Sequence, residues 1–363
     1  MDRRSFISKA GAGAALAGTT ALAAPAIAQG KRTLTMVTSV PHGFAVFDSA
    51  AVYFANAVTE MTDGQITIEK KAAGELVGAF EVFDAVSSGQ ADIYHSADYY
   101  FGGQHPGLYY FTSVPFGATT EEFMAWYYHG GGHDLHDELG QIFNLKSFSC
   151  GSTNMQPGGW FNKEINSGDD LKGLKMRIPG LGGDVMAKLG ASPVSLPGGQ
   201  IYENLVSGAI DATEWVGPWN DEAYKFYEAT KYYYYPGMHE PASQLAAGFN
   251  ASFWGTLSKS DQHLIQAVAQ AENSNIMSEY NAKNGAALER LVNEQGVEVR
   301  EFNDDVYAAF RRGSEEVFEE VVEHSALARR IHESFLAARK TVGDYTRLND
   351  VEYVLKRNDA LEG

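Results

Sequence analysis

An arginine at the end of a predicted strand could bind the carboxylate of a small molecule. Leu174, Met176 and Ile178 alternate with basic residues, which is typical of a strand with one buried face. Arg177 then points to the opposite side, and it ends the strand because Pro179 cannot donate to a sheet ladder. A guanidinium pairs with a carboxylate through two parallel hydrogen bonds. The alternative is a surface arginine in an ordinary ion pair.

A glutamate between large aromatic residues is the second candidate. Glu214 and Trp215 follow a short predicted strand, and Trp219 lies a few residues further on. A carboxylate that indole rings partly remove from water needs a neighbouring cation or a proton. The segment therefore predicts a positive charge beside Glu214, and the alternative is a structural ion pair.

A histidine cluster offers a weaker signal. Imidazole is a common zinc ligand, so His129, His133 and His136 could suggest a metal site. Their spacing lacks the H-E-x-x-H arrangement, and the glycines at 130–132 argue against a rigid helix that presents them together. We therefore expect these histidines on the surface.

Motifs of enzymes are missing from the sequence. There is no G-x-S-x-G nucleophile elbow and no G-x-G-x-x-G dinucleotide loop, and the single cysteine, Cys150, excludes an internal disulfide framework. We therefore predict that the protein is not an enzyme. A secreted metal-dependent lyase or hydrolase is the alternative, and it would need a general base with a perturbed pKa beside the metal.

Composition and charge limit the partners. The chain has 363 residues, 44% of them hydrophobic, so it can build a large core. Its formal charge of −18 argues against nucleic acid, which needs a basic surface. A receptor for small anions would need a local cation in this negative field, either an arginine or a metal ion.

The first 28 residues predict export. Arg3 and Arg4 precede a stretch rich in alanine and glycine that ends in an A-x-A cleavage signal at Ala28. The stretch is too polar for a membrane span. We expect a twin-arginine signal peptide over 1–28 and a location in the bacterial periplasm.

The elements that must position Arg177 and Glu214 follow an α/β pattern. Strand and helix signals alternate along the chain, and residues 83–93 resemble residues 202–212 at an offset of 119. We read this repeat as two equivalent lobes with ligands bound beyond their strand ends. The offset predicts that side chains from the first lobe face Trp215 and Trp219 across a cleft; these are His95, Tyr99 and Tyr100.

The C-terminal third is predicted to be helical. Amphipathic helices follow Ser258, and we expect Gly343 to break the last long one. The segment 344–357 carries Tyr345, Leu348 and Leu355 without a core of its own, so exchange between two copies could bury it.

Five segments carry a resemblance to a known family. They are LKGLKMRIPG at 171–180, AKLGASPV at 187–194, QIYENLVSGAIDATEW at 200–215, STNMQPGGWF at 152–161 and EWVGPWND at 214–221. They resemble the solute receptors of tripartite ATP-independent periplasmic (TRAP) transporters, and in particular the branch that binds 2-oxo and 2-hydroxy monocarboxylates with a metal ion. The resemblance implies two α/β lobes, a long spanning helix, a membrane permease as partner, and a homodimer formed by exchange of a C-terminal helix.

The resemblance also implies roles for individual residues. Arg177 matches the arginine that binds the ligand carboxylate. Gln156, Glu214 and the carbonyl of Trp215 match three metal ligands, and Glu240 stands at the fourth. Two glutamates and a ligand carboxylate against one arginine would be neutralised by a divalent ion, so we favour calcium over sodium.

The resulting hypothesis is a periplasmic receptor for a pyruvate- or lactate-like acid, bound as a metal chelate. A receptor of the same fold for a sugar acid or other organic acid without metal is the alternative. We divide the chain into the signal peptide (1–28), a first lobe (29–152), a second lobe (153–240), crossover segments and long helices (241–342), and the C-terminal helix (343–363).

Overall fold

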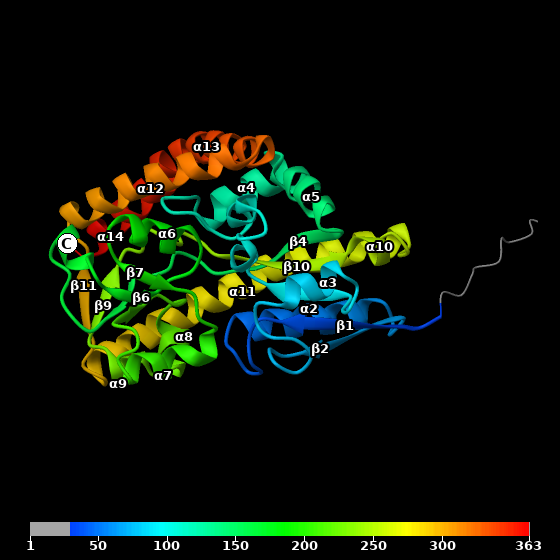
Figure 1. The fold of residues 1–363 in the computed structure, drawn as a ribbon, viewed down its shortest axis with the longest axis horizontal. Helices are drawn as coiled ribbons and strands as arrows, with labels where there is room; N and C mark the ends of the chain where they lie inside the picture. The colour runs from blue at the N-terminus through cyan, green and yellow to red at the C-terminus, as the bar shows by residue number, and fades with distance from the viewer. Residues whose placement is uncertain (1–29, 363) are drawn as a thin grey trace, which may run out of the picture.

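Two β-sheets organise the chain (Figure 1). The computed structural model describes residues 30–362, and the predicted signal peptide lies outside the described residues. The first sheet has the order β2-β1-β3-β10-β4, with β1 parallel to β2 and β3, and β10 antiparallel to both of its neighbours. Its strands are β1 (Arg32–Thr38), β2 (Ile66–Lys71), β3 (Ile93–Ser96), β4 (Leu145–Ser152) and β10 (Gln244–Asn250).

The second sheet uses mostly the middle of the chain. Its order is β11-β9-β5-β8-β6-β7, and β6 runs parallel to both β7 and β8. Its strands are β5 (Gly159–Phe161), β6 (Lys175–Arg177), β7 (Ser192–Val194), β8 (Ala212–Thr213), β9 (Tyr232–Tyr235) and β11 (Glu298–Glu301). The last of these interrupts the C-terminal region that the sequence predicted to be helical.

Two connections cross between the sheets and pair with each other. Residues 153–158 lead from β4 to β5, and residues 236–243 lead from β9 back to β10. Backbone bonds join them from Thr153 N–H to the Ser243 carbonyl (2.9 Å) and from Gln156 N–H to the Glu240 carbonyl (3.2 Å). The connections therefore form a short antiparallel ribbon between the sheets.

A long helix runs along both sheets. The helix α11 (Lys259–Asn293) has 35 residues, which at the usual rise is a length of about 50 Å. It packs against β4 and α2 (Phe47–Met61) on the first sheet's side and against α8 (Pro218–Ala223) on the other (Figure 1). The predicted α/β fold with two sheet units and a long spanning helix is confirmed.

The remaining helices cover the two sheets. Among them, α12 packs on α6, and α13 packs on α4. None of the helices in residues 30–362 combines the length and the apolar character that a membrane crossing requires. Their bounds are α3 (Val82–Ser87), α4 (Thr120–His129), α5 (Gly132–Ile142), α6 (Gly180–Lys188), α7 (Ile201–Val206), α9 (Phe226–Ala229), α10 (Ala251–Trp254), α12 (Asp304–His324), α13 (Ala326–Thr346) and α14 (Glu352–Glu362), with short 3₁₀ helices η1 (Asp98–Phe101) and η2 (Pro106–Phe111).

The internal repeat has a structural counterpart. The helices α3 and α7 begin 119 residues apart, and so do the strands β3 and β8 that follow them. Gly89 and Gly208 stand between helix and strand at equivalent places, with φ of 84° and 71°. A side chain would be strained in that left-handed conformation, so glycine allows both turns.

The expected helix break at Gly343 is wrong. The helix α13 continues through Gly343 to Thr346, a π-helical turn follows (Arg347–Val351), and α14 begins at Glu352. A Cβ on Gly343 would lie 3.0 Å from the Glu122 carboxylate of α4. The glycine therefore provides the space in which α13 passes α4 closely.

Candidate ligand-binding site

Arg177 is the last residue of β6 and is fully buried. Its Nε donates to the Leu196 carbonyl (3.2 Å), and one terminal nitrogen donates to the Tyr100 hydroxyl (3.3 Å). The other terminal nitrogen pairs with the Glu214 carboxylate. The guanidinium also stacks over the Trp215 ring, with its carbon 4.9 Å from the ring centroid. A guanidinium has five N–H groups, so donors remain for a ligand carboxylate.

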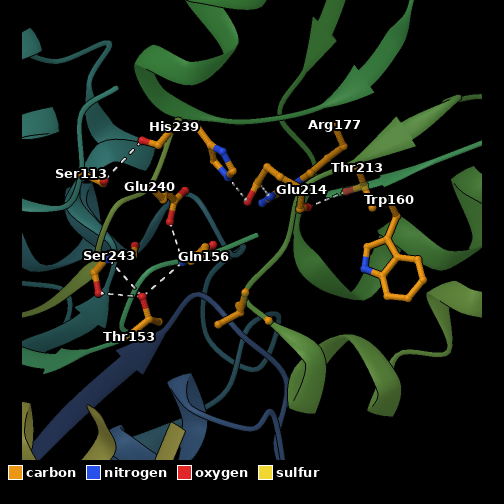
Figure 2. A network of polar contacts seen from close by, with 12 residues as sticks. Ser113, Thr153, Gln156, Trp160, Arg177, Thr213, Glu214, His239, Glu240 and Ser243 are labelled. Carbon is orange, nitrogen blue, oxygen red and sulfur yellow. Dashed lines mark hydrogen bonds and ion pairs between the residues drawn. The ribbon is translucent and has the colours of Figure 1, made fainter. Parts of the chain in front are cut away.

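Three residues with metal-binding side chains converge beside Arg177. Glu214 follows β8, and His239 and Glu240 lie on the connection from β9 to β10. One potential ligand atom from each lies within 4.8 Å of the others, and all three side chains are buried. Figure 2 shows the His239 ring directed at Glu214, with Nε2 3.4 Å from Oε2. This separation suits an ion pair, although the geometry is not that of a hydrogen bond.

Gln156 extends the cluster from the other connection. Its Nε2 donates to one oxygen of Glu240 (2.8 Å) and to the Thr153 hydroxyl (3.3 Å), as Figure 2 shows. The amide oxygen of Gln156 and one carboxylate oxygen each of Glu214 and Glu240 are buried without a hydrogen-bond donor among the described residues. Buried acceptors without donors are costly. Three of them facing one cluster fit a bound cation.

The charges of the cluster shift its titration. Burial, and then the charge of Glu214, raises the pKa of Glu240 from 4.5 to about 7. For His239, burial lowers the pKa, but the carboxylates of Glu214 and Glu240 together raise it more, so the net direction is upward from 6.5. The sequence-based charge count omitted His239. With His239 protonated, two cations face two carboxylates, so the cluster can balance its own charge when no metal is bound.

The first sheet contributes two aromatic residues to the site. Tyr99 and Tyr100 lie on η1, directly after β3, with their ring centroids 4.6 Å apart. Tyr100 bonds to Arg177, and a Cβ on Gly180 would lie 2.6 Å from the Tyr99 ring. Gly180 has a φ of 62°, and it allows the ring to lie against the start of α6. The structure thus places Tyr100 beside Arg177 and Tyr99 against the start of α6, both after the strand to which the repeat pointed.

A buried histidine contacts the 3₁₀ helix that carries the two tyrosines. His136 Nε2 lies 2.9 Å from an oxygen of Asp98, the first residue of η1, and Nδ1 lies 3.1 Å from the Tyr127 hydroxyl. Tyr94 donates to the other Asp98 oxygen (2.8 Å). The expected surface position of the histidine cluster is therefore wrong for His136. Its role here is to anchor the turn that carries Tyr99 and Tyr100.

Two predicted site residues lie elsewhere. His95 is buried within β3, where burial lowers its pKa to about 4, and its Nε2–H donates to the Cys150 carbonyl (2.8 Å). Trp219 lies on α8 against α11, with Lys283 Nζ 4.1 Å from its ring centroid and its backbone N–H bonded to Asn284 (2.9 Å). The structure brings neither side chain to Arg177.

Trp215 connects the two sides of the molecule. Its buried ring packs between Phe44 and Phe47, which follow β1, with centroid separations of 5.3 and 6.0 Å. On α11, Tyr280 donates from its hydroxyl to the Val216 carbonyl (2.8 Å) and lies 3.2 Å from that of Met155. The long helix therefore holds the loops of Trp215 and Gln156 together.

Comparison with known proteins identifies the family of the chain. Residues 36–325 match bacterial extracellular solute-binding protein, family 7 (DctP). A monocarboxylate 2-oxoacid-binding periplasmic protein of Nostoc sp. is 41% identical over 318 residues, which covers 88% of this chain and 87% of the relative.

Two solved TRAP solute-binding proteins are similar in fold and sequence. One from Bordetella bronchiseptica, a mixed-occupancy dimer with copurified calcium and picolinate, has a TM-score of 0.89 and 31% identity and covers 92% of this chain and 99% of its own. One from Pseudoalteromonas atlantica with bound sodium and pyruvate has a TM-score of 0.86 and 36% identity, covering 89% and 98%. The family consists of receptors, which confirms the prediction that the protein is not an enzyme. The chain belongs to the DctP family of periplasmic solute-binding proteins, the receptors of TRAP transporters.

Proposed function

We propose that this receptor captures a small 2-oxo or 2-hydroxy monocarboxylate together with a metal ion and delivers it to a TRAP permease. The observation that carries the proposal is the set of buried oxygens without donors on Gln156, Glu214 and Glu240, next to Arg177. A cation satisfies such acceptors, and the arginine satisfies the carboxylate of the ligand. Twin-arginine export of the folded receptor belongs to the same proposal.

Different residues bind the carboxylate of the ligand and the metal ion. Arg177 binds the carboxylate with the N–H groups that its present partners leave free, and Tyr99 and Tyr100 close the site from the first sheet. The cation would be held by Gln156, Glu214, Glu240 and the Trp215 carbonyl, and when bound it supplies positive charge to the ligand oxygens. Pyruvate and picolinate both place a donor atom next to the carboxylate-bearing carbon, so each can chelate a metal. The relatives that bind them support this ligand class.

Calcium suits this donor set better than sodium does. The ligands are oxygens, and calcium accepts an irregular shell of about 6–8 of them. With His239 neutral, a divalent ion balances the two glutamates and the ligand carboxylate against Arg177. A bound calcium ion would repel the proton of His239. The ring nitrogen would then be available as a metal ligand beside the oxygens.

A titration with and without a chelator tests the proposal. We expect pyruvate to change the fluorescence of the buried Trp215 region in calcium, and to bind at least tenfold more weakly in sodium with excess chelator. Dialysed protein gives the starting state, and acetate, which lacks the 2-oxo group, is the control ligand. Two results would refute the proposed ligand class. One is an affinity for acetate equal to that for pyruvate. The other is binding of a sugar acid while no 2-oxo acid binds, in calcium or in sodium.

The dimer is part of the proposed function. The apolar side chains of the C-terminal segment are exposed, among them Leu348 (76%), Tyr353 (65%) and Leu355 (54%). Within the described residues α14 packs chiefly on the π-helical turn before it, and its own residues, Glu352–Glu362, are exposed. Exchange of this segment between two copies would remove that surface from water. The dimer of the Bordetella relative supports the proposal.

A chain that ends at Thr346 should therefore be monomeric. This end keeps all of α13, including its contact with α4 at Gly343, and removes the π-helical turn and α14. Light scattering should give a dimer for the full-length mature chain and a monomer for the shortened one. In the full-length chain, Leu348→Ser with Leu355→Ser should weaken the dimer, while Lys356→Ser should not. A shortened chain with the mass of a dimer would exclude the exchange.

A further inference from the structure

One buried carboxylate, outside the proposed ligand contacts, holds the turn at Val216 and Gly217 that follows β8. Asp221 on α8 is 1% exposed. Its Oδ1 accepts the backbone N–H groups of Val216 (3.3 Å) and Gly217 (3.1 Å). Its Oδ2 accepts Trp160 Nε1–H (2.7 Å) and the Tyr233 hydroxyl (2.8 Å). Four donors, from the turn on one side and from β5 and β9 on the other, therefore meet at this side chain.

The contact with Val216 fixes more than one atom. The Val216 N–H and the Trp215 carbonyl belong to the same planar trans peptide and point in opposite directions. When the N–H is held by Asp221, the carbonyl must face away from Asp221. Tyr280 fixes the next peptide plane through its bond to the Val216 carbonyl. Among residues 30–362, no hydrogen-bond donor contacts the Trp215 carbonyl, so it is free to bind a ligand.

We propose that Asp221 is a positioning residue that aims the Trp215 carbonyl at the bound cation. The inference rests on the proposed function, because it gives that carbonyl a purpose only if a cation binds beside Glu214. Groups that hydrogen-bond to a metal ligand or to its peptide orient that ligand, and their loss typically reduces metal affinity about 10- to 100-fold.

The chemistry of the site requires an anion at this position. All four groups around Asp221 are donors, so both carboxylate oxygens must act as acceptors. An asparagine would turn its amide N–H₂ toward one pair of donors and lose either the turn or the strand contacts. Burial raises the pKa of Asp221 to about 6, which leaves the group ionised at neutral pH.

Coordinated water distinguishes positioning from support of the fold. The probe is Eu³⁺, a calcium-sized ion with oxygen preference whose luminescence lifetimes in H₂O and D₂O report the waters bound to it. In the absence of an organic acid, Eu³⁺ bound to the Asp221→Asn variant should carry one more water than Eu³⁺ bound to the wild type, because the Trp215 carbonyl turns away from the ion. Calcium competition should show affinity reduced by about 10- to 100-fold.

A matched control and a second variant keep the test decisive. Asp211→Asn alters a carboxylate that also accepts a backbone N–H, that of Lys175 (3.1 Å), at the other end of β8, and should change neither readout. Tyr233→Phe removes one donor from Oδ2 and should give a smaller effect in the same direction, which tests the proposal even if Asp221→Asn does not fold. An unchanged water count in both variants would overturn the positioning role, even with weakened calcium binding. Failure of the wild type to bind Eu³⁺ or calcium would instead refute the cation site itself.

Discussion

Arg177→Ala is expected to weaken pyruvate binding by about 30-fold to several thousand-fold, which corresponds to roughly 2–5 kcal/mol for a buried, charge-assisted contact. Two effects add up. The ligand carboxylate loses its donors, and Glu214 loses the partner that neutralises it in a fully buried position. Isothermal titration calorimetry in calcium measures the loss.

Conservative variants separate these two effects. Arg177→Lys keeps the charge beside Glu214 but cannot reproduce the planar fork, so it should recover little of the ligand affinity. Lys175→Ala, on the same strand with an exposed side chain, should bind like the wild type. Affinity close to that of the wild type in Arg177→Ala would show that the carboxylate binds elsewhere.

Glu240→Gln is expected to remove the calcium requirement. The amide keeps the shape and an oxygen ligand but takes away one negative charge, so a monovalent ion now balances the closed site. Calcium affinity should fall by about 100-fold or more, and pyruvate should bind in sodium with chelator present.

In the wild type, calcium affinity should rise as the pH increases through about 7, since the pKa of Glu240 lies there and its protonated form is a poor ligand. That pH dependence should be smaller in the variant.

Another buried glutamate provides the matched control. Glu272 on α11 is 0% exposed, and one of its oxygens also has no donor among the described residues. Burial raises its pKa to about 8, but it lies outside the cluster. Glu272→Gln should leave the calcium dependence of pyruvate binding unchanged. If Glu240→Gln binds calcium as the wild type does, Glu240 is not a ligand.

Local patterns in the sequence predicted the strand ends of the site. Pro179 stops β6 after Arg177, and the repeat pointed to η1 with Tyr99 and Tyr100. Both signals are local, because a strand end and a glycine turn depend on neighbouring residues. The same logic did not reach Trp219: a residue that follows a strand end can turn away with its helix, as α8 does toward α11.

The errors concern contacts between distant segments. His136 pairs with Asp98, which is 38 residues away, and its own surroundings are charged and rich in glycine. His239 faces Glu214 across 25 residues, and no spacing rule connects them. Gly343 was read as a helix breaker because propensity ignores the neighbour, Glu122, that needs the space. Burial of these polar residues depends on partners that lie far away in the chain, and local spacing and propensity do not reveal such partners.

The paired connections between the sheets have a mechanical consequence. Gln156 and Glu240 lie on the two strands of one ribbon, which is joined by backbone bonds at 153–243 and 156–240. If one sheet rotates against the other at this ribbon, the rotation also displaces the oxygens of Gln156 and Glu240 that we propose as cation ligands. The angle between the two sheets would then set the geometry of the ligands around the cation. A ligand too bulky for full closure would be rejected by a distorted coordination shell, before any wall of the pocket clashed with it.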